Sequence, residues 1–148
     1  FFTVADKTAL LTTLRDGLRR NGTLSFADFV LAEFDQNEGP VMEQWHRTEP
    51  LTPRPWPIDA YRASLEELGL ETVHFEDDSE HYRGLVIGAW RRFLDGLDSN
   101  RLDRAFVGAL MPEAEMWLHR MRALESGQLR LIRVTARHAG DRLLAGKK

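Results

Sequence analysis

The sequence contains no cysteine. Disulfides, thiolate-held metals and cysteine nucleophiles are therefore excluded together. It also has no apolar run approaching the roughly 18 residues of a membrane-spanning helix, and no signal-peptide pattern at its start. We therefore expect a cytoplasmic protein with no membrane partner.

Neither sign of charge is in large excess. The chain has 20 basic and 23 acidic residues, for a net charge of -3. Domains that bind nucleic acids usually carry a basic excess, so we expect no nucleic-acid partner. With 148 residues the chain has the length of a single domain, 1–148, enough to bury about two thirds of its unfolded surface.

A glycine-rich turn between a strand and a helix, of the kind that holds a phosphate or a nucleotide cofactor, is also missing. Of the 11 glycines, Gly84 and Gly88 stand four residues apart, but within an apolar helical pattern. They share one helix face there. That face either lets another backbone approach closely or simply tolerates two poor helix formers.

The start of the chain has the pattern of half a β-α-β unit. Residues 1–4, Phe-Phe-Thr-Val, predict the end of a strand, and leucines at helical spacing predict a helix over residues 6–20 with Asp6 as its N-cap. Asn21 and Gly22 end that helix, and residues 23–32 predict a strand. Because the front half of the unit is absent, we expect a C-terminal piece of a larger protein.

Residues 34–57 predict a long loop that is rich in proline and carries Trp45 and Trp56. Loops of this length are usually functional or disordered, and two tryptophans favour one that packs. Beyond it, the pattern predicts a helix over 58–68, a strand over 72–75, a helical region over 79–126, a strand over 128–136 and a flexible tail over 138–148.

Two residues of the helical region carry local predictions. Ser79 is expected to cap its first helix. Pro112 is expected to kink or restart its second helix, because proline lacks the amide donor that an interior position uses.

Three stretches resemble the class I S-adenosylmethionine-dependent methyltransferases. Residues 5–22 resemble the helix and loop between the family's strands four and five, although Arg-Arg-Asn-Gly stands here in place of the usual Leu-Arg-Pro-Gly-Gly motif. Residues 56–71 resemble a tyrosine-bearing helix that ends in Ala-Gly-Phe-Glu, with Leu68 and Leu70 in place of alanine and phenylalanine. Residues 128–136 resemble the closing strand. The three stretches follow the family's order across most of the chain.

The resemblance implies an α/β fold, namely the C-terminal part of a doubly wound Rossmann-like sheet, which is α+β when isolated. About three strands in mixed or antiparallel order are expected, with 128–136 antiparallel between 23–32 and 72–75, and with several helices. S-adenosylmethionine is implied as the cofactor of the parent enzyme. Its binding half is missing, so we expect no cofactor bound to this piece.

Ligands of open α/β sheets bind beyond the carboxyl ends of the parallel strands. Asp28 and Thr3 belong there, so both are candidates for binding a small-molecule methyl acceptor. Asp28 either orients the acceptor or is a polar strand end held by loop amides. Trp45 and Trp56 either form aromatic walls, including a cation-π contact to an amine, or anchor the long loop. Methyl transfer needs mainly proximity and alignment, so no catalytic residue is assigned.

The dense cluster of His74, His81 and the four carboxylates between them could bind a divalent metal. Carboxylates are also favoured at a helix start by the amide dipoles, and this interpretation, without a metal site, is the one we adopt.

Two function classes remain. The first is the acceptor-side portion of a methyltransferase, inactive as this piece. The alternative is a non-enzymatic module that binds a small ligand or dimerises through the long loop and the helical region. The unpaired edge of strand 23–32 further predicts a homodimer or a swapped oligomer.

Overall fold

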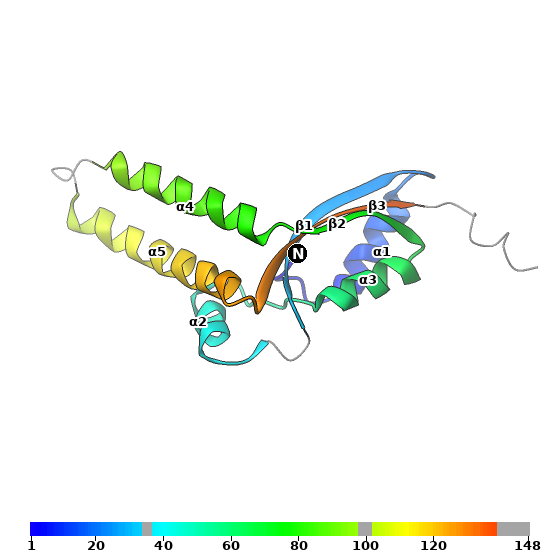
Figure 1. Ribbon diagram of the computed structural model, residues 1–148, viewed down its shortest axis with the longest axis horizontal. Helices are drawn as coiled ribbons and strands as arrows, with labels where there is room; N and C mark the ends of the chain where they lie inside the picture. The colour runs from blue at the N-terminus through cyan, green and yellow to red at the C-terminus, as the bar shows by residue number, and fades with distance from the viewer. Residues whose placement is uncertain (34–36, 98–101, 139–148) are drawn as a thin grey trace, which may run out of the picture.

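The computed structural model describes residues 1–33, 37–97 and 102–138. In chain order the elements are α1 (Lys7–Gly17), β1 (Thr23–Leu31), α2 (Pro40–Thr48), α3 (Ile58–Glu67), β2 (Leu70–Asp77), α4 (Ser79–Asp95), α5 (Arg104–Glu125) and β3 (Leu129–His138) (Figure 1). The mixture of helices with one sheet confirms the predicted α/β class.

The strands form one 3-stranded sheet in the order β1-β3-β2. β3 is antiparallel to both neighbours, with Asp28 opposite Ile132 on one side and Phe75 opposite Val134 on the other. β1 and β2 therefore run parallel to each other. This arrangement confirms the predicted order, although β2 is longer than the four residues expected.

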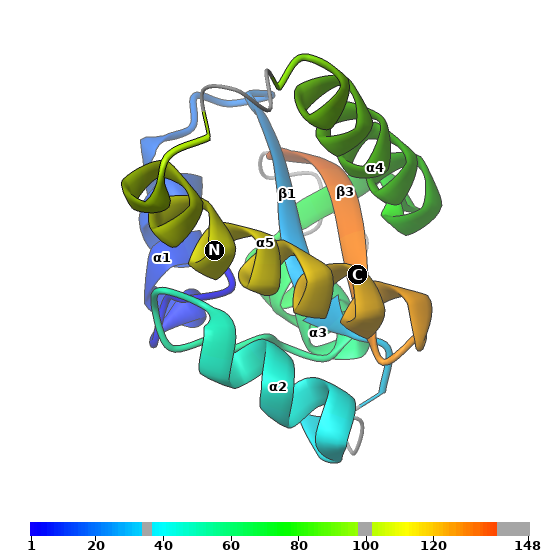
Figure 2. The same cartoon turned by 90° about the vertical axis from the view of Figure 1, so that its left-hand side faces the viewer.

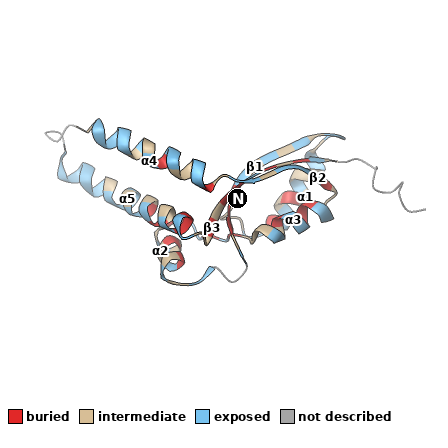
Figure 3. Cartoon of the chain, in the orientation of Figure 1, coloured by how far each residue is buried: buried red, intermediate tan, exposed pale blue. Residues whose placement is uncertain are grey.

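Alternation along β1 divides the core into two parts. Val30 packs on one face of the sheet with Leu11 of α1 and Leu65 of α3. Phe29 and Leu31 pack on the other face, with residues of α2 and the end of α5. Figure 3 shows the buried residues gathered where these helices meet the sheet. The period of two in the strand thus decides which helix each side chain contacts.

The ends of α1 follow the local rules. Asp6 caps it as predicted, with Oδ1 accepting a hydrogen bond of 2.8 Å from the amide of Ala9. Asn21 takes the left-handed conformation, with φ of 62°, and turns the chain into β1. Asparagine is among the few residues that adopt this conformation readily.

The prediction that residues 1–4 end a strand is wrong. They form a turn, closed by a hydrogen bond of 2.8 Å from the amide of Val4 to the carbonyl of Phe1. The Phe1 ring stacks on Phe26 at 5.3 Å, whereas the Phe2 ring meets Phe29 edge-on at 5.2 Å. Because the two rings enter opposite halves of the core, the backbone curls around β1 and does not pair with it.

Residues 34–57 are not a plain loop, because they contain α2. Pro40 stands at the first position of that helix, where its missing amide donor costs nothing. Met42 and Trp45, three residues apart, are fully buried. The high proline content led us to predict a loop where the chain forms a helix that packs by its apolar face.

One prediction about the helical region is wrong, and the alternative that Pro112 restarts a helix is excluded. Asp78, not Ser79, is the N-cap of α4, and Ser79 Oγ instead accepts from the amide of Leu131 at 2.8 Å. Pro112 lies inside the continuous helix α5 and does not restart it. Proline removes one interior hydrogen bond and crowds the carbonyl four residues earlier, here that of Gly108. Of the predicted tail, His138 ends β3 and residues 139–148 fall outside the described part.

Within the described residues no helix is both long and apolar enough to cross a membrane.

Candidate functional site

The helices α2, α4 and α5 gather at one end of the sheet. β1 and β2 end at Leu31 and Asp77, and their carboxyl ends point the same way because the strands are parallel. α2 follows β1 and α4 follows β2 along the chain, and Figure 2 shows α5 crossing in front of the strands with α2 below it. It is the edge where open α/β sheets bind ligands.

Asp28 lies three residues before the end of β1 and is only 2% exposed. Its Oδ2 accepts a hydrogen bond from the hydroxyl of Tyr61 on α3. Its Oδ1 has no hydrogen-bonding partner of normal geometry and lies 3.1 Å from the nitrogen of Phe1. Because a carboxylate oxygen has two lone pairs, Oδ1 can accept a further polar hydrogen beside the Phe1 nitrogen.

Lys7 lies close to this carboxylate and is 1% exposed. Its ammonium donates to the carbonyls of Phe1 at 2.9 Å, Val4 at 3.3 Å and Arg54 at 2.7 Å. Burial lowers the pKa of Lys7, and the charge of Asp28 partly offsets that effect. The ammonium therefore ties the opening turn and the loop before α3 to the start of α1.

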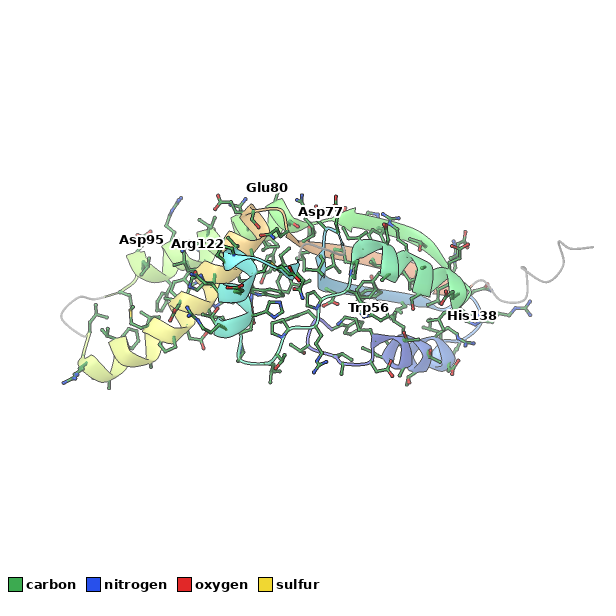
Figure 4. All side chains as sticks on the ribbon, turned by 90° about the horizontal axis from the view of Figure 1, so that it is seen from below. Trp56, Asp77, Glu80, Asp95, Arg122 and His138 are labelled. Atoms are coloured by element: carbon green, nitrogen blue, oxygen red, sulfur yellow. The ribbon has the colours of Figure 1, made fainter. Side chains whose placement is uncertain are left out.

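Aromatic rings gather around Tyr61, the residue that binds the Asp28 carboxylate. The Tyr61 ring lies 5.7 Å from Phe26 and 5.3 Å from Trp56. Trp56 is half-buried, and its carbonyl accepts from the amide of Leu31 at 2.9 Å. Figure 4 shows Trp56 in the segment that leads into α3. The structure thus brings Asp28 and Trp56 into one cluster, joined by Tyr61.

Trp45 belongs to the opposite half of the core. It is fully buried, and its Nε1 donates to Glu49 Oε1 at 2.6 Å. Arg120 of α5 binds the same carboxylate through both oxygens, with Nε 2.7 Å from Oε1. Trp45 therefore anchors α2 against α5 and lies apart from Trp56. Thr3, half-buried, sits in the opening turn.

Sequence reasoning did not single out Lys7 or Tyr61 as site residues. A signal for Tyr61 was available, because Asp28 interrupts the apolar face of β1 and a buried carboxylate needs a donor. Among the apolar residues at helical spacing over 58–68, only Tyr61 carries a hydroxyl. For Lys7 no such signal exists, since its three acceptors are carbonyls that only the tertiary fold brings together.

The acidic cluster around the start of α4 binds arginine side chains of β3. Arg133 contacts Asp78 at 2.5 Å and Arg130 contacts Asp77 at 3.3 Å, while His74 lies 3.1 Å from Glu76. Across the described ranges, no group of three or more histidine or carboxylate side chains is placed to hold a metal ion. The carboxylates here connect α4 and β2 to the central strand.

Solved methyltransferase structures are similar to this chain in fold. A protein from Galdieria sulphuraria, designated a sarcosine dimethylglycine methyltransferase, matches with a TM-score of 0.66 and 15% identity over 94% of this chain and 50% of its own. The cyclopropane synthase MmaA2 of Mycobacterium tuberculosis matches with a TM-score of 0.65 and 11% identity over 88% and 49%.

A third structure is phosphoethanolamine N-methyltransferase 2 of Haemonchus contortus, in complex with phosphomonomethylethanolamine and S-adenosylhomocysteine. It matches with a TM-score of 0.61 and 8% identity over 90% of this chain and 30% of its own. No family model matches the sequence. No curated protein matches it either.

The chain therefore has the fold of the C-terminal part of class I S-adenosylmethionine-dependent methyltransferases, as the sequence resemblance predicted. It spans about half the length of the first two of these structures. At these identities the likeness concerns the fold.

Proposed function

We propose that this chain is the acceptor-side portion of an S-adenosylmethionine-dependent methyltransferase that acts on a small molecule. The observation that carries the proposal is the buried carboxylate of Asp28 near the carboxyl end of β1, where Tyr61 holds one oxygen and the other lies 3.1 Å from the Phe1 nitrogen. A group placed there is at the edge where this fold binds its ligands.

The chemistry around Asp28 favours an amine as the methyl acceptor. A carboxylate attracts an ammonium group and orients it by a charge-assisted hydrogen bond, and aromatic faces stabilise it further. Trp56, Tyr61 and Phe26 supply those rings. Two of the similar structures are named for amine substrates, which supports the same class here.

The residues of this chain would bind and orient the acceptor. Bound in the parent enzyme, S-adenosylmethionine supplies an activated methyl group, and transfer then depends on proximity and alignment. The described residues contain no glycine-rich turn between a strand and a helix, so they do not fit the cofactor by themselves. We assign no step to a cofactor site here, expect no S-adenosylmethionine bound to this piece, and keep the cytoplasmic location as a prediction.

The test compares parent-length enzymes that carry Asp28→Asn and Asp16→Asn. Transfer of labelled methyl groups from S-adenosylmethionine is measured against small primary, secondary and tertiary amines. Asp28→Asn should lower kcat/KM by at least about tenfold, since a charge-assisted contact is worth about 1.5–3 kcal/mol. Asp16 is exposed on α1, so its variant should keep full activity.

Circular dichroism and thermal unfolding must show that the Asp28→Asn enzyme is folded. A folded variant with unchanged kcat/KM toward every amine that the enzyme methylates would contradict the role of Asp28. On the 148-residue chain alone, calorimetry with S-adenosylmethionine should detect no binding. Saturable binding there would contradict the assignment of the cofactor site to the missing part.

A further inference from the structure

The helices α4 and α5 form a hairpin that extends away from the sheet (Figure 1). Only their ends nearest the sheet are buried: Ser79 and Val86 in α4, and Met116, His119, Ala123 and Leu124 in α5. Figure 3 shows the outer half of the hairpin as almost entirely exposed. Nothing else in the described part of the chain covers this outer half.

The hairpin carries an unusual amount of exposed apolar surface. Of the large apolar side chains that are exposed in the described residues, all but Leu51 and Val73 belong to it. Met111 is 60% exposed, Leu85 56% and Leu94 55%. The others are Ile87, Phe93, Leu102, Phe106, Val107 and Leu118. Scattered apolar residues on a surface are ordinary, but nine of them concentrated on one hairpin indicate an interaction site.

A groove of about 630 Å³ separates the two helices on one side. Its apolar lining includes Val86, Trp90 and Trp117. A second hollow, of about 320 Å³, is bounded by the same three residues together with Phe93 and Leu110. The two helices are therefore incompletely packed against each other, and side chains of a further helix could fill the space between them.

We propose that a second copy of this chain covers the hairpin, so that two hairpins pair as an antiparallel four-helix bundle. The inference rests on the hairpin alone and holds whether or not the chain serves methyl transfer. Packing a second helical layer on an apolar helix face is the standard way to bury it.

Charge favours a second copy over a partner of one sign. Arg83, Arg91 and Arg122 line the same groove as Asp95 and Glu125, and Arg83 pairs with Glu125 at 3.1 Å. Figure 4 shows Arg122 and Asp95 labelled on the two different helices of the hairpin. In a two-fold contact the same patch faces itself, so basic groups of one copy can meet acidic groups of the other. A strongly basic partner would oppose the three arginines, and a strongly acidic one would oppose Asp95 and Glu125.

The available area suits a reversible dimer. The 17 residues of α4 span about 25 Å, and two neighbouring helices present a face about 20 Å wide. The face is thus about 500 Å² per copy, or about 1,000 Å² in total, which is at the lower end for a specific interface. We therefore expect a dimer that forms and dissociates with concentration.

The rest of a longer parent chain is a weaker candidate for this surface. The hairpin connects β2 to β3, whereas the open edge available for further strands is that of β1. Upstream strands of a doubly wound sheet would add at β1, on the other side of β3 from β2.

Sedimentation equilibrium of the 148-residue chain over a range of concentrations tests the proposal. The wild-type chain should show a monomer–dimer equilibrium, and Leu94→Glu and Met111→Glu should each raise the dimer dissociation constant at least about tenfold. Leu51→Glu and Val73→Glu are the matched controls, because Leu51 and Val73 are as exposed but lie outside the hairpin. Both controls should leave the dissociation constant unchanged, and circular dichroism should show all four variants folded.

Two outcomes would overturn the proposal. The first is a wild-type chain that stays monomeric at the highest concentration, which would mean that the hairpin is covered by something else or by nothing. The second is a dimer that both hairpin variants leave intact, which would place the contact elsewhere, such as at the open edge of β1.

Discussion

The hydroxyl of Tyr61 on α3 donates a hydrogen bond to the carboxylate of Asp28 on β1, and the two residues are 0% and 2% exposed. Burial raises the pKa of Tyr61 well above its ordinary value of 10.0, and the charge of Asp28 and the hydrogen bond raise it further. The phenol therefore keeps its proton in the folded state under conditions where an unfolded tyrosine would lose it.

This pair predicts a loss of stability in alkali. Above pH 10 the unfolded chain releases the Tyr61 proton while the folded chain retains it, so the folded state binds more protons and the free energy of unfolding falls as pH rises. The loss should approach about 1.4 kcal/mol per pH unit for this one group. Lys7 acts in the opposite sense, but only below its ordinary pKa of 10.5, because its pKa is lowered by burial.

Urea unfolding between pH 9 and pH 12 measures the effect. Tyr61→Phe should remove the alkaline slope that Tyr61 contributes, while its stability at neutral pH falls because the Asp28 oxygen loses its donor. Equal slopes in wild type and Tyr61→Phe would contradict the shielded phenol.

The core around this pair shows how far sequence patterns reach. The sequence pattern predicted the strand over 23–32, which carries Asp28, and the helix over 58–68, which carries Tyr61. Neither pattern carries the distance between the two elements, which depends on how β3 separates β1 from β2. The Asp28–Tyr61 contact joins residues 33 positions apart and follows from that packing.

The buried ion pair between Glu49 and Arg120 gives a second prediction. The Glu49 side chain is 1% exposed and that of Arg120 is 11% exposed, so Glu49→Gln leaves a nearly buried guanidinium without its counter-charge. Losing one partner of such a pair costs about 3–5 kcal/mol. Thermal and urea unfolding should show this loss. Glu125→Gln, which removes an acidic partner of Arg83 that is itself 68% exposed, should cost less than about 1 kcal/mol.

The same ion pair marks a limit of the sequence analysis. The prolines of 34–57 suggested a loop, because proline is rare inside helices, but Pro40 stands at the one helix position that favours it. Once α2 forms, Trp45 and Glu49 fall four residues apart on one face and meet Arg120. Trp45, one of the two tryptophans considered as an aromatic wall for the acceptor, therefore packs α2 on α5.

Ser79 supplies a third prediction. Its Oγ accepts the amide hydrogen of Leu131 at 2.8 Å in a buried position, so Ser79→Ala leaves that amide without its acceptor. A buried unsatisfied donor costs about 1–3 kcal/mol. Stability should fall by this amount, and hydrogen exchange at Leu131 should become faster. Ser25→Ala is the control: its hydroxyl meets Thr135 Oγ1 at an exposed site, and the expected change is within about 0.5 kcal/mol.

The same substitution at two glycines should have opposite effects on stability. Gly69 follows α3 with φ of 68°, a left-handed conformation that costs other residues about 1–2 kcal/mol, so Gly69→Ala should destabilise by about that amount. Gly84 lies inside α4, and a Cβ added there would meet nothing within 4 Å, so Gly84→Ala should stabilise by about 0.5–1 kcal/mol. Urea midpoints measured at a concentration where the chain is monomeric compare the two. Neither added methyl group meets a neighbouring atom, so a difference in sign reports backbone conformation and not packing. Two shifts of the same sign would contradict the backbone geometry of α4 or of the turn after α3.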